Sequence, residues 1–215
     1  MAAEIAPCIT VEDAAEYQQA IERLKPFAER VHIDISDGDF APRQLISADQ
    51  LTWPSEWKVD VHAMVARPSE VIEDLIARKP HTIILHAEAD EDLLPIIQHI
   101  QQAGIKAGLA LLKTTVPKTI TGLLEIVDHA LIFSGNLGHY GGSASMMQLE
   151  KVRLIRNIHP EIEIGWDGGA SVDNAYSLAQ GGIDVINSGG AINNASEPET
   201  VYRNMVKEVN KHSVI

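Results

Sequence analysis

The sequence holds a single cysteine, Cys8, among its 215 residues. One thiol cannot form a disulfide within the chain, so the fold must be stable without such a cross-link. Disulfides are typical of oxidising compartments, and a chain with one cysteine fits the reducing cytoplasm best. The first ten residues, MAAEIAPCIT, lack a basic start and an apolar core, so we expect no secretory signal.

Long apolar runs and basic residues are also scarce. No stretch reaches the roughly 18–20 apolar residues that a membrane helix needs, so we expect no membrane partner. The sequence has 17 Lys and Arg residues against 30 Asp and Glu residues, which gives a formal net charge of −13. Such a chain has no general electrostatic attraction to nucleic acid, so none is expected as a partner. An anionic ligand would need local attraction, which backbone N–H groups can supply without Lys or Arg.

A regular alternation of two kinds of segment runs through the whole chain. Short runs rich in β-branched residues predict eight strands, at 4–9, 31–35, 58–65, 82–86, 106–111, 129–133, 163–166 and 184–187. Longer amphipathic stretches predict helices between them, at 12–24, 68–78, 90–103, 116–127, 145–157, 172–180 and 197–210. The second connection, 37–56, is less regular and predicts only a short helix at 48–51.

This alternation, without a linker or a low-complexity segment, predicts parallel βαβ units in one α/β domain over residues 1–215. Right-handed crossovers leave two arrangements, a closed (β/α)₈ TIM barrel or an open doubly wound sheet. The pattern alone does not choose between them. The length suits a barrel, because such domains commonly run to about 200–250 residues.

Polar side chains stand at or near the ends of three predicted strands. His32 and Asp34 are two residues apart on one strand and therefore face the same way. His62 lies near the end of the next strand, and Asp167 follows the seventh. In a (β/α)₈ barrel the carboxyl ends of the strands carry the active site. Two imidazoles and two carboxylates converging there predict a site for one divalent metal ion, Zn, Fe, Mn or Co.

Each of these residues taken alone has a more ordinary interpretation. A single strand His is more often a hydrogen-bonded structural residue than a metal ligand, so the metal hypothesis depends on the four together. Asp60 shares the face of His62 but comes earlier, which predicts a place in the interior or at the bottom of a barrel. Asp37 lies past its strand beside Gly38, so a turn or cap role is expected.

Pairs of glycines follow the last three predicted strands. Glycine lets a backbone approach a ligand closely, and the loops after strands seven and eight are a frequent phosphate site in these barrels. One such pair usually marks a turn, whereas three in succession favour phosphate binding. The predicted phosphate-binding residues are Gly141, Gly142, Gly168, Gly169, Gly189 and Gly190.

Several segments together resemble the ribulose-phosphate 3-epimerase family. They keep their order and spacing over nearly the whole chain: IAPCI at 5–9, HIDISDGDFAP at 32–42, VDVHAMV at 59–65, ILHAEA at 84–89, YGG at 140–142, LEKVRLIR at 149–156, WDGGAS at 166–171 and GGAI at 189–192. The resemblance implies a (β/α)₈ barrel of the ribulose-phosphate-binding type. It also implies one catalytic divalent metal, with His32, Asp34, His62 and Asp167 as its ligands.

The same resemblance implies an isomerase of carbohydrate metabolism. The implied reaction is epimerisation at C3 of a ketose phosphate, D-ribulose 5-phosphate to D-xylulose 5-phosphate. Asp34 and Asp167 are the implied catalytic acid and base, which exchange protons on opposite faces of a metal-stabilised enediolate. A small phosphorylated sugar and a homo-oligomeric assembly are the implied partners.

Around the expected sugar the chain departs from the family pattern. Ser36 and Ser134 stand where the family usually has Met, and Val11 stands where it usually has Ser. Met64 keeps its family position, and His139 is an additional polar residue near the expected mouth of the barrel. We therefore expect Ser36, Met64 and His139 to form part of the substrate wall.

The altered wall leaves other functions open. One alternative is an epimerase or isomerase of another phosphosugar, such as a ketohexose 6-phosphate. Another is a non-catalytic phosphosugar-binding barrel, which would not need both aspartates. Decarboxylases of this fold typically need a Lys beside the aspartates of the second and third strands, and the segments HIDIS and VDVHA offer none.

Overall fold

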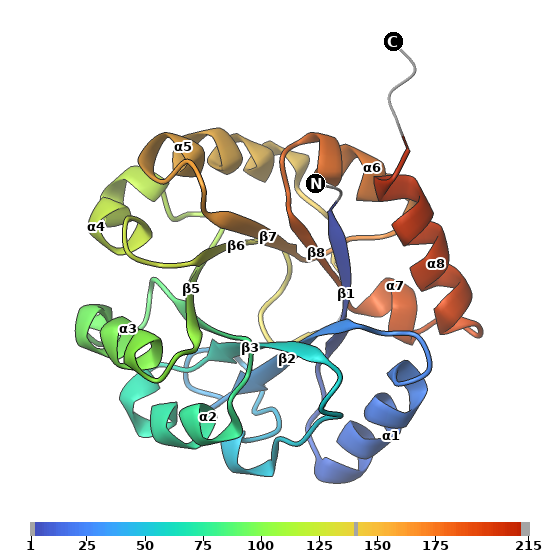
Figure 1. The fold of residues 1–215 in the computed structure, drawn as a ribbon, viewed down its shortest axis with the longest axis horizontal. Coiled ribbons are helices and arrows are strands. Elements are labelled where there is room, and N and C mark those ends of the chain that lie inside the picture. The colour runs from blue at the N-terminus through green and yellow to red at the C-terminus, as the bar shows by residue number, and fades with distance from the viewer. Residues whose placement is uncertain (1–2, 140–141, 212–215) are drawn as a thin grey trace.

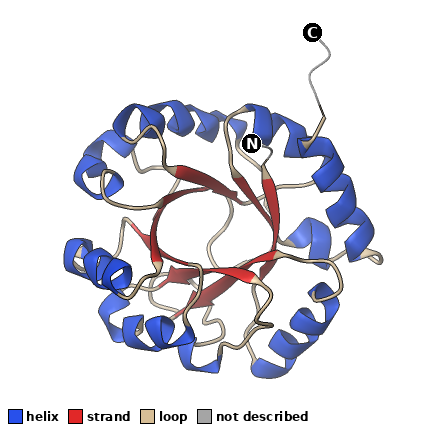
Figure 2. Ribbon diagram, viewed as in Figure 1, coloured by secondary structure: helices blue, strands red, loops and turns tan. Residues whose placement is uncertain are grey.

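The eight strands close on themselves into a ring. We use a computed structural model that describes residues 3–139 and 142–211. All strand pairs are parallel, the spatial order follows the chain from β1 to β8, and β8 pairs with β1. The helices surround this ring on the outside (Figure 1, Figure 2). The closure excludes the open doubly wound sheet and confirms the (β/α)₈ barrel.

The strands match their predicted bounds to within one residue at either end. They are β1 (Glu4–Ile9), β2 (Arg30–Ser36), β3 (Lys58–Met64), β4 (Thr82–His86), β5 (Lys106–Leu111), β6 (His129–Phe133), β7 (Glu163–Asp167) and β8 (Val185–Ser188). Most positions along them are buried on both faces, which is typical of parallel strands covered by helices outside and side chains inside.

The helices agree less closely with the prediction. The α-helices are α1 (Ala14–Leu24), α2 (Ile72–Arg78), α3 (Leu93–Gln102), α4 (Thr121–Leu124), α5 (Glu150–Ile158), α6 (Val172–Gln180), α7 (Gly190–Asn193) and α8 (Pro198–Val209). Short 3₁₀ helices are η1 (Ala48–Gln50), η2 (Pro68–Glu70), η3 (Pro117–Ile120) and η4 (Met146–Leu149). The predicted helix 116–127 is thus a 3₁₀ turn followed by one α-turn, and α7 was not predicted.

Helix α1 illustrates how the local sequence sets an element. Its N-cap Asp13 accepts hydrogen bonds from the backbone N–H groups of Ala15 and Glu16, at 2.8 and 2.9 Å. Such a cap satisfies N–H groups that have no partner within the helix. Tyr17, Ile21 and Leu24 follow at helical spacing and are buried against the barrel. One capped, one-sided helix thereby connects β1 to β2.

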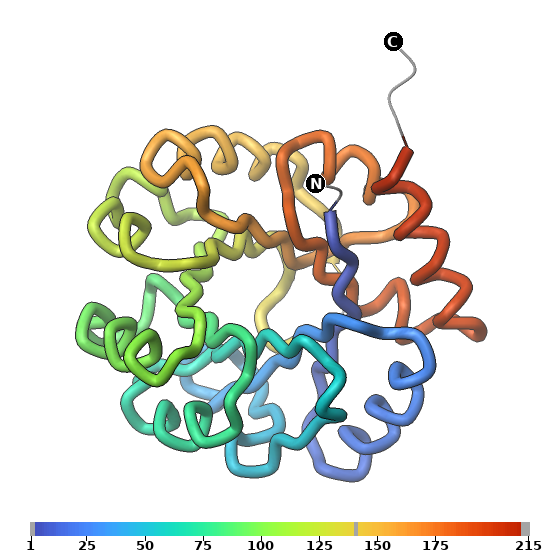
Figure 3. Tube along the Cα trace, in the orientation of Figure 1, coloured from blue at the N-terminus to red at the C-terminus, as the bar shows by residue number. Residues whose placement is uncertain are grey.

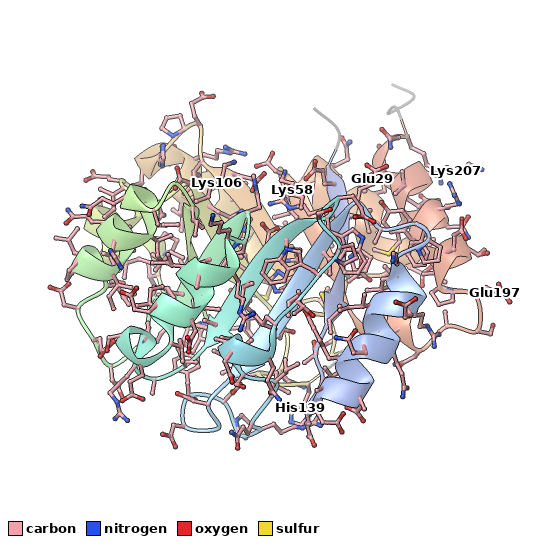
Figure 4. The ribbon with its side chains drawn as sticks, turned by 60° about the horizontal axis from the view of Figure 1, so that its bottom comes forward. Glu29, Lys58, Lys106, His139, Glu197 and Lys207 are labelled. Atoms are coloured by element: carbon pink, nitrogen blue, oxygen red, sulfur yellow. The ribbon has the colours of Figure 1, made fainter. Side chains whose placement is uncertain are left out.

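The two ends of the barrel differ in character. The first residues of β3 and β5, Lys58 and Lys106, lie at one edge of the molecule, and His139, which follows β6, lies at the other (Figure 4). At the amino-terminal end, buried Arg30 bonds to Asp60 at 2.6 Å and to Glu163 at 2.8 Å. This ion-pair network lies at the amino-terminal end of the barrel. It confirms the prediction that Asp60 lies in the interior or at the bottom of the barrel.

The tube view shows the loops that follow the strands and lead outward to the surrounding helices (Figure 3). The loop after β2 is held by Asp37, whose Oδ1 accepts from the N–H groups of Asp39 and Phe40, both at 2.9 Å. The predicted turn role of Asp37 is therefore confirmed. Within the described residues, none of the helices combines the length and the apolar character that a membrane crossing requires.

Candidate active site

Four predicted ligands meet at the carboxyl end of the barrel. His32 and Asp34 come from β2, His62 from β3 and Asp167 from β7, and each offers one ligand atom within 4.8 Å of all the others. Strand register explains part of this convergence, because Asp34 is paired directly with His62. His32 Nε2 lies 3.3 Å from Asp34 Oδ1 and 4.0 Å from Asp167 Oδ2.

The Asp34 carboxylate is held at both oxygens. Its Oδ1 lies 2.9 Å from His62 Nδ1, and its Oδ2 accepts a hydrogen bond from the Thr10 hydroxyl at 2.5 Å. Sequence reasoning missed Thr10. The signal was available, because Thr10 directly follows β1 and so belongs to the same end of the barrel as the predicted ligands.

His32 is fully buried, at 0% exposure. Within the part of the chain that the structure describes, neither of its ring nitrogens has a hydrogen-bond partner. A buried polar atom without a partner costs about 1–3 kcal/mol, so such atoms call for an explanation. A bound cation beside Asp34 and Asp167 is one group that would satisfy this imidazole.

The two aspartates differ in proton affinity. Burial raises the pKa of Asp167 to about 6, and the negative charge of Asp34 adds to this effect. Burial alone would also raise the pKa of Asp34, but the neighbouring imidazoles of His32 and His62 outweigh this effect and hold that pKa well below its usual range. Neighbouring acids with separated pKa values can take different roles in one proton transfer.

A second imidazole, His86 at the end of β4, lies behind His62. The two Nε2 atoms are 2.8 Å apart, and both rings are fully buried. Burial lowers the pKa of His86 to about 4, with the neighbouring His62 acting in the same direction and Glu88 opposing it. His86 is therefore neutral at pH 7. The segment ILHAEA contains it, but no role was predicted for it.

A cavity of about 350 Å³ adjoins this cluster and is lined by two of the four predicted ligands, Asp34 and Asp167. This volume is at the lower end of the range for small-molecule sites, roughly 300–1,000 Å³. Besides Asp34 and Asp167, the described residues that line it are Cys8, Thr10, Met64, Phe133, Gly135, Asn136, Gly138, His139, Gly142, Gly168, Gly169, Ala170, Ser171, Gly189, Gly190, Ala191 and Asn194. None of them is a Lys or an Arg.

The predicted wall and phosphate residues fall into three groups. Met64, His139 and five of the six predicted glycines line the cavity, whereas Gly141 lies outside the described residues. Ser36 does not belong to the described lining, and its hydroxyl accepts from Gly38 N at 3.3 Å. Its role in the substrate wall stays a prediction. Ser134 instead accepts from the backbone N–H of Ser145 at 2.8 Å and so holds the loop after β6.

Backbone packing, and not only close approach to a ligand, requires glycine at position 168. The φ of Gly168 is +110°, and an added Cβ would lie 2.0 Å from the backbone nitrogen of Gly135. Gly168 therefore lets the loop after β7 pack directly on the loop after β6, at the wall of the cavity.

We expect Gly168→Ala to lower the free energy of unfolding by more than about 1 kcal/mol, because Ala is strained at this φ and meets fixed backbone. Thermal unfolding of the purified variant checks this. Gly122→Ala is the matched control, because Gly122 lies in α4 with open space around the added Cβ. We expect that control to be neutral or slightly stabilising, and an equal effect in both variants would contradict the packing argument.

The fold and the site together define a (β/α)₈ barrel that carries a His and Asp cluster and a glycine-lined cavity at the carboxyl ends of its strands. The model of the ribulose-phosphate 3 epimerase family matches residues 4–193. The chain therefore belongs to the ribulose-phosphate 3-epimerase family.

Individual relatives agree with this assignment. A ribulose-phosphate 3-epimerase of Helicobacter pylori strain J99 is 31% identical over 88% of this chain and 90% of its own length. The cytoplasmic isoform of Oryza sativa subsp. japonica is 30% identical over 97% of this chain and 95% of its own length. Among solved structures, 3-hexulose-6-phosphate synthase of Salmonella typhimurium has a TM-score of 0.73 at 15% identity, covering 96% of this chain and 98% of its own, which supports the fold alone.

Proposed function

We propose that the chain epimerises a ketose phosphate at C3 with the help of one divalent metal, and that its substrate is D-ribulose 5-phosphate. The observation that carries this proposal is the clustering of two aspartates and two histidines at a small cavity, which Asp34 and Asp167 line. Family membership supports the reaction type, because the curated relatives are named for it.

The residues present fit a divalent metal. Two imidazole nitrogens and two carboxylate oxygens suit Zn, Fe, Mn or Co, and the ring nitrogens of His32 have no hydrogen-bond partner among the described residues. We assign His32, Asp34, His62 and Asp167 as the ligands. A metal held there would act as a Lewis acid that stabilises negative charge on neighbouring substrate oxygens.

Asp34 and Asp167 are the proposed proton carriers. Inversion at carbon requires that one group remove a proton from one face and that another return a proton to the opposite face. The two carboxylates come from β2 and β7, which contribute to different parts of the ring, and both line the cavity. Their separated proton affinities favour a state in which one carboxylate accepts while the other donates.

The glycine loops are the proposed phosphate end of the cavity. Gly168 and Gly169 follow β7, and Gly189 and Gly190 follow β8, where barrels of this kind frequently bind phosphate. Because the described lining holds no Lys or Arg, we expect backbone N–H groups to bind the phosphate. A homo-oligomeric state and a cytoplasmic location stay predictions of the family resemblance and the cysteine content.

Steady-state turnover tests the proposal and its substrate. The purified chain is stripped of metal, reloaded with Zn, Mn, Fe or Co, and assayed with D-ribulose 5-phosphate and with a ketohexose 6-phosphate. We expect metal-restored turnover of the pentulose phosphate, with a kcat/KM at least about tenfold above that of the hexulose phosphate. A preference for the hexulose phosphate would reject the substrate, and no turnover of either would reject the reaction.

A further inference from the structure

A chain of three polar contacts runs from the metal cluster into the protein. Asp34 Oδ1 lies 2.9 Å from His62 Nδ1, and His62 Nε2 lies 2.8 Å from His86 Nε2. His86 Nδ1 in turn lies 3.2 Å from Glu88 Oε2. Both rings are fully buried, so their nitrogens depend on these contacts rather than on water. Glu88 lies two residues after the end of β4 and is not among the residues that line the cavity described above.

The far end of this chain is fixed by the loop after β5. Glu88 Oε1 accepts hydrogen bonds from the backbone N–H of Leu112, at 3.0 Å, and from the Thr115 hydroxyl. Lys151 on α5 donates to the carbonyls of Leu112 and Lys113, at 2.5 and 3.3 Å, and so holds the same loop. Because one carboxylate oxygen is engaged by two donors, the other is held toward His86.

Counting protons along the chain gives each nitrogen a role. Both ends are carboxylates, which accept hydrogen bonds when ionised, and an uncharged imidazole supplies one N–H, so two N–H groups serve three contacts. In the arrangement that leaves His62 Nδ1 free for a metal, Glu88 accepts the proton of His86 Nδ1, and His86 Nε2 accepts from His62 Nε2. His62 Nδ1 is then a bare lone pair that faces an oxygen of Asp34. Two acceptors at 2.9 Å repel each other, and a cation beside both removes the repulsion.

We propose that Glu88 and His86 are positioning residues that fix the tautomer of His62, so that its Nδ1 is the atom available to a metal. Carboxylates behind a ligating histidine commonly act in this way, and their loss typically weakens metal binding by about 10–100-fold. Here the carboxylate acts through an intervening imidazole. The proposal rests on the proposed function only in taking His62 as a metal ligand.

The substitution Glu88→Gln keeps the size of the side chain but reverses the direction of the hydrogen bonds that run through His86 to His62. The backbone N–H of Leu112 and the Thr115 hydroxyl donate to the amide oxygen of Gln, so the amide NH₂ faces His86 Nδ1. His86 must then carry its proton on Nε2, and His62 must accept there and carry its own on Nδ1. A protonated Nδ1 cannot coordinate. We expect the Kd for Zn²⁺, measured by competition with a chelator, to rise about 10–100-fold.

Two further variants separate positioning from folding. His86→Phe keeps a ring between Phe40 and Phe133, whose centroids lie 4.6 and 5.9 Å from that of His86, but removes both nitrogens. It should weaken Zn²⁺ binding to a similar degree. The double variant should lose no more zinc affinity than the single variant that binds zinc more weakly. Glu88 and His86 belong to one series of hydrogen bonds, so the effects of their substitutions are not additive. Glu91→Gln is the charge-matched control, since Glu91 instead accepts from Ser69, and it should bind as the wild type does.

Imidazole ¹⁵N spectra of the zinc-loaded full chain supply a readout that a purely structural role would not move. We expect the His62 proton on Nε2 in the wild type and a loss of that signature in Glu88→Gln. Wild-type zinc affinity in Glu88→Gln, or additive losses in the double variant, would overturn the proposal while leaving the epimerase assignment intact. Absence of zinc binding in the wild type would overturn both. Tight, Glu88-dependent zinc binding without turnover would support the proposal and reject the proposed function.

Discussion

We expect Asp167→Asn to lower kcat for epimerisation of D-ribulose 5-phosphate by about 10²–10⁴-fold, the range that a positioned acid or base contributes. An amide has nearly the same shape as the carboxylate but cannot take up or deliver the proton. Asp167 suits this role because it lines the cavity, and because burial and the charge of Asp34 raise the pKa of its carboxyl to about 6. Steady-state kinetics with the metal-loaded variant measure the loss.

Metal content has to be measured beside the rate, because Asp167 is also an assigned ligand. Asn retains a carbonyl oxygen in the position of the carboxylate oxygen, so we expect metal binding to weaken but to persist at saturating metal. Asp173→Asn, at an acid in the first turn of α6 outside the described lining, is the control and should keep full turnover. An Asp167→Asn variant that binds metal and retains wild-type kcat would contradict the acid/base role.

We expect Arg30→Met to lower the free energy of unfolding by about 3–5 kcal/mol, the usual cost of removing one partner from a buried ion pair. Arg30 is 3% exposed and its partner Asp60 is 1% exposed. Without the guanidinium, the Asp60 carboxylate remains buried and uncompensated. For a domain of this size the loss corresponds to a fall in Tm of roughly 6–20 °C.

The pH dependence of this difference gives a second check. Burial alone would raise the pKa of Glu163, but bonds from His129 and Arg30 outweigh it and hold that pKa well below the usual 4.5. The pKa of Asp60 is likewise held low by Arg30, against the effect of burial. Carboxylates with lowered pKa values stabilise the fold above the unfolded-state pKa, and this stabilisation is lost as the pH falls. The gap between wild type and Arg30→Met should therefore persist from pH 7 to about pH 5 and shrink as the pH falls below the unfolded-state pKa values near 4.

Lys58→Met is the matched control for Arg30→Met. Lys58 also pairs with an acid at the amino-terminal end of the barrel, Glu4 at 3.2 Å, but the two side chains are 33% and 51% exposed. Exposed pairs of this kind contribute little, so we expect a change within about 0.5 kcal/mol. Chemical denaturation at several pH values measures all three proteins. Equal losses in the two variants, or a gap that grows in acid, would contradict the role of the buried network.

The strands could be predicted closely because β-branched runs end in clear turn signals, whereas barrel closure could not. Pairing of β8 with β1 joins residues at opposite ends of the chain, and no local pattern encodes that contact. The short helix α7 was missed because four residues beginning with glycine show no helical period. The helix expected at 116–127 is shortened, since Pro117 favours a 3₁₀ start and Gly122 weakens the following turn.

The candidate site likewise has features that the sequence predicts and features that it does not. His32, Asp34 and His62 could be predicted, since a period of two and a place near the strand end determine the face and the height of each side chain. The contacts of Thr10 and His86 could not, because each depends on how neighbouring strands are staggered in the closed ring. Gly168 was predicted to lie at the site, but its packing against Gly135 is a feature of two loops from different strands.

Proton exchange at C3 is the measurement that tests the proposed chemistry most directly. D-Ribulose 5-phosphate is incubated in D₂O with the metal-loaded protein and followed by ¹H NMR. We expect the C3 proton to be replaced by deuterium as D-xylulose 5-phosphate forms, with both changes lost after chelation and restored by added metal. Retention of the C3 proton with every one of the four metals, in protein shown to bind metal, would contradict a metal-assisted two-aspartate epimerase.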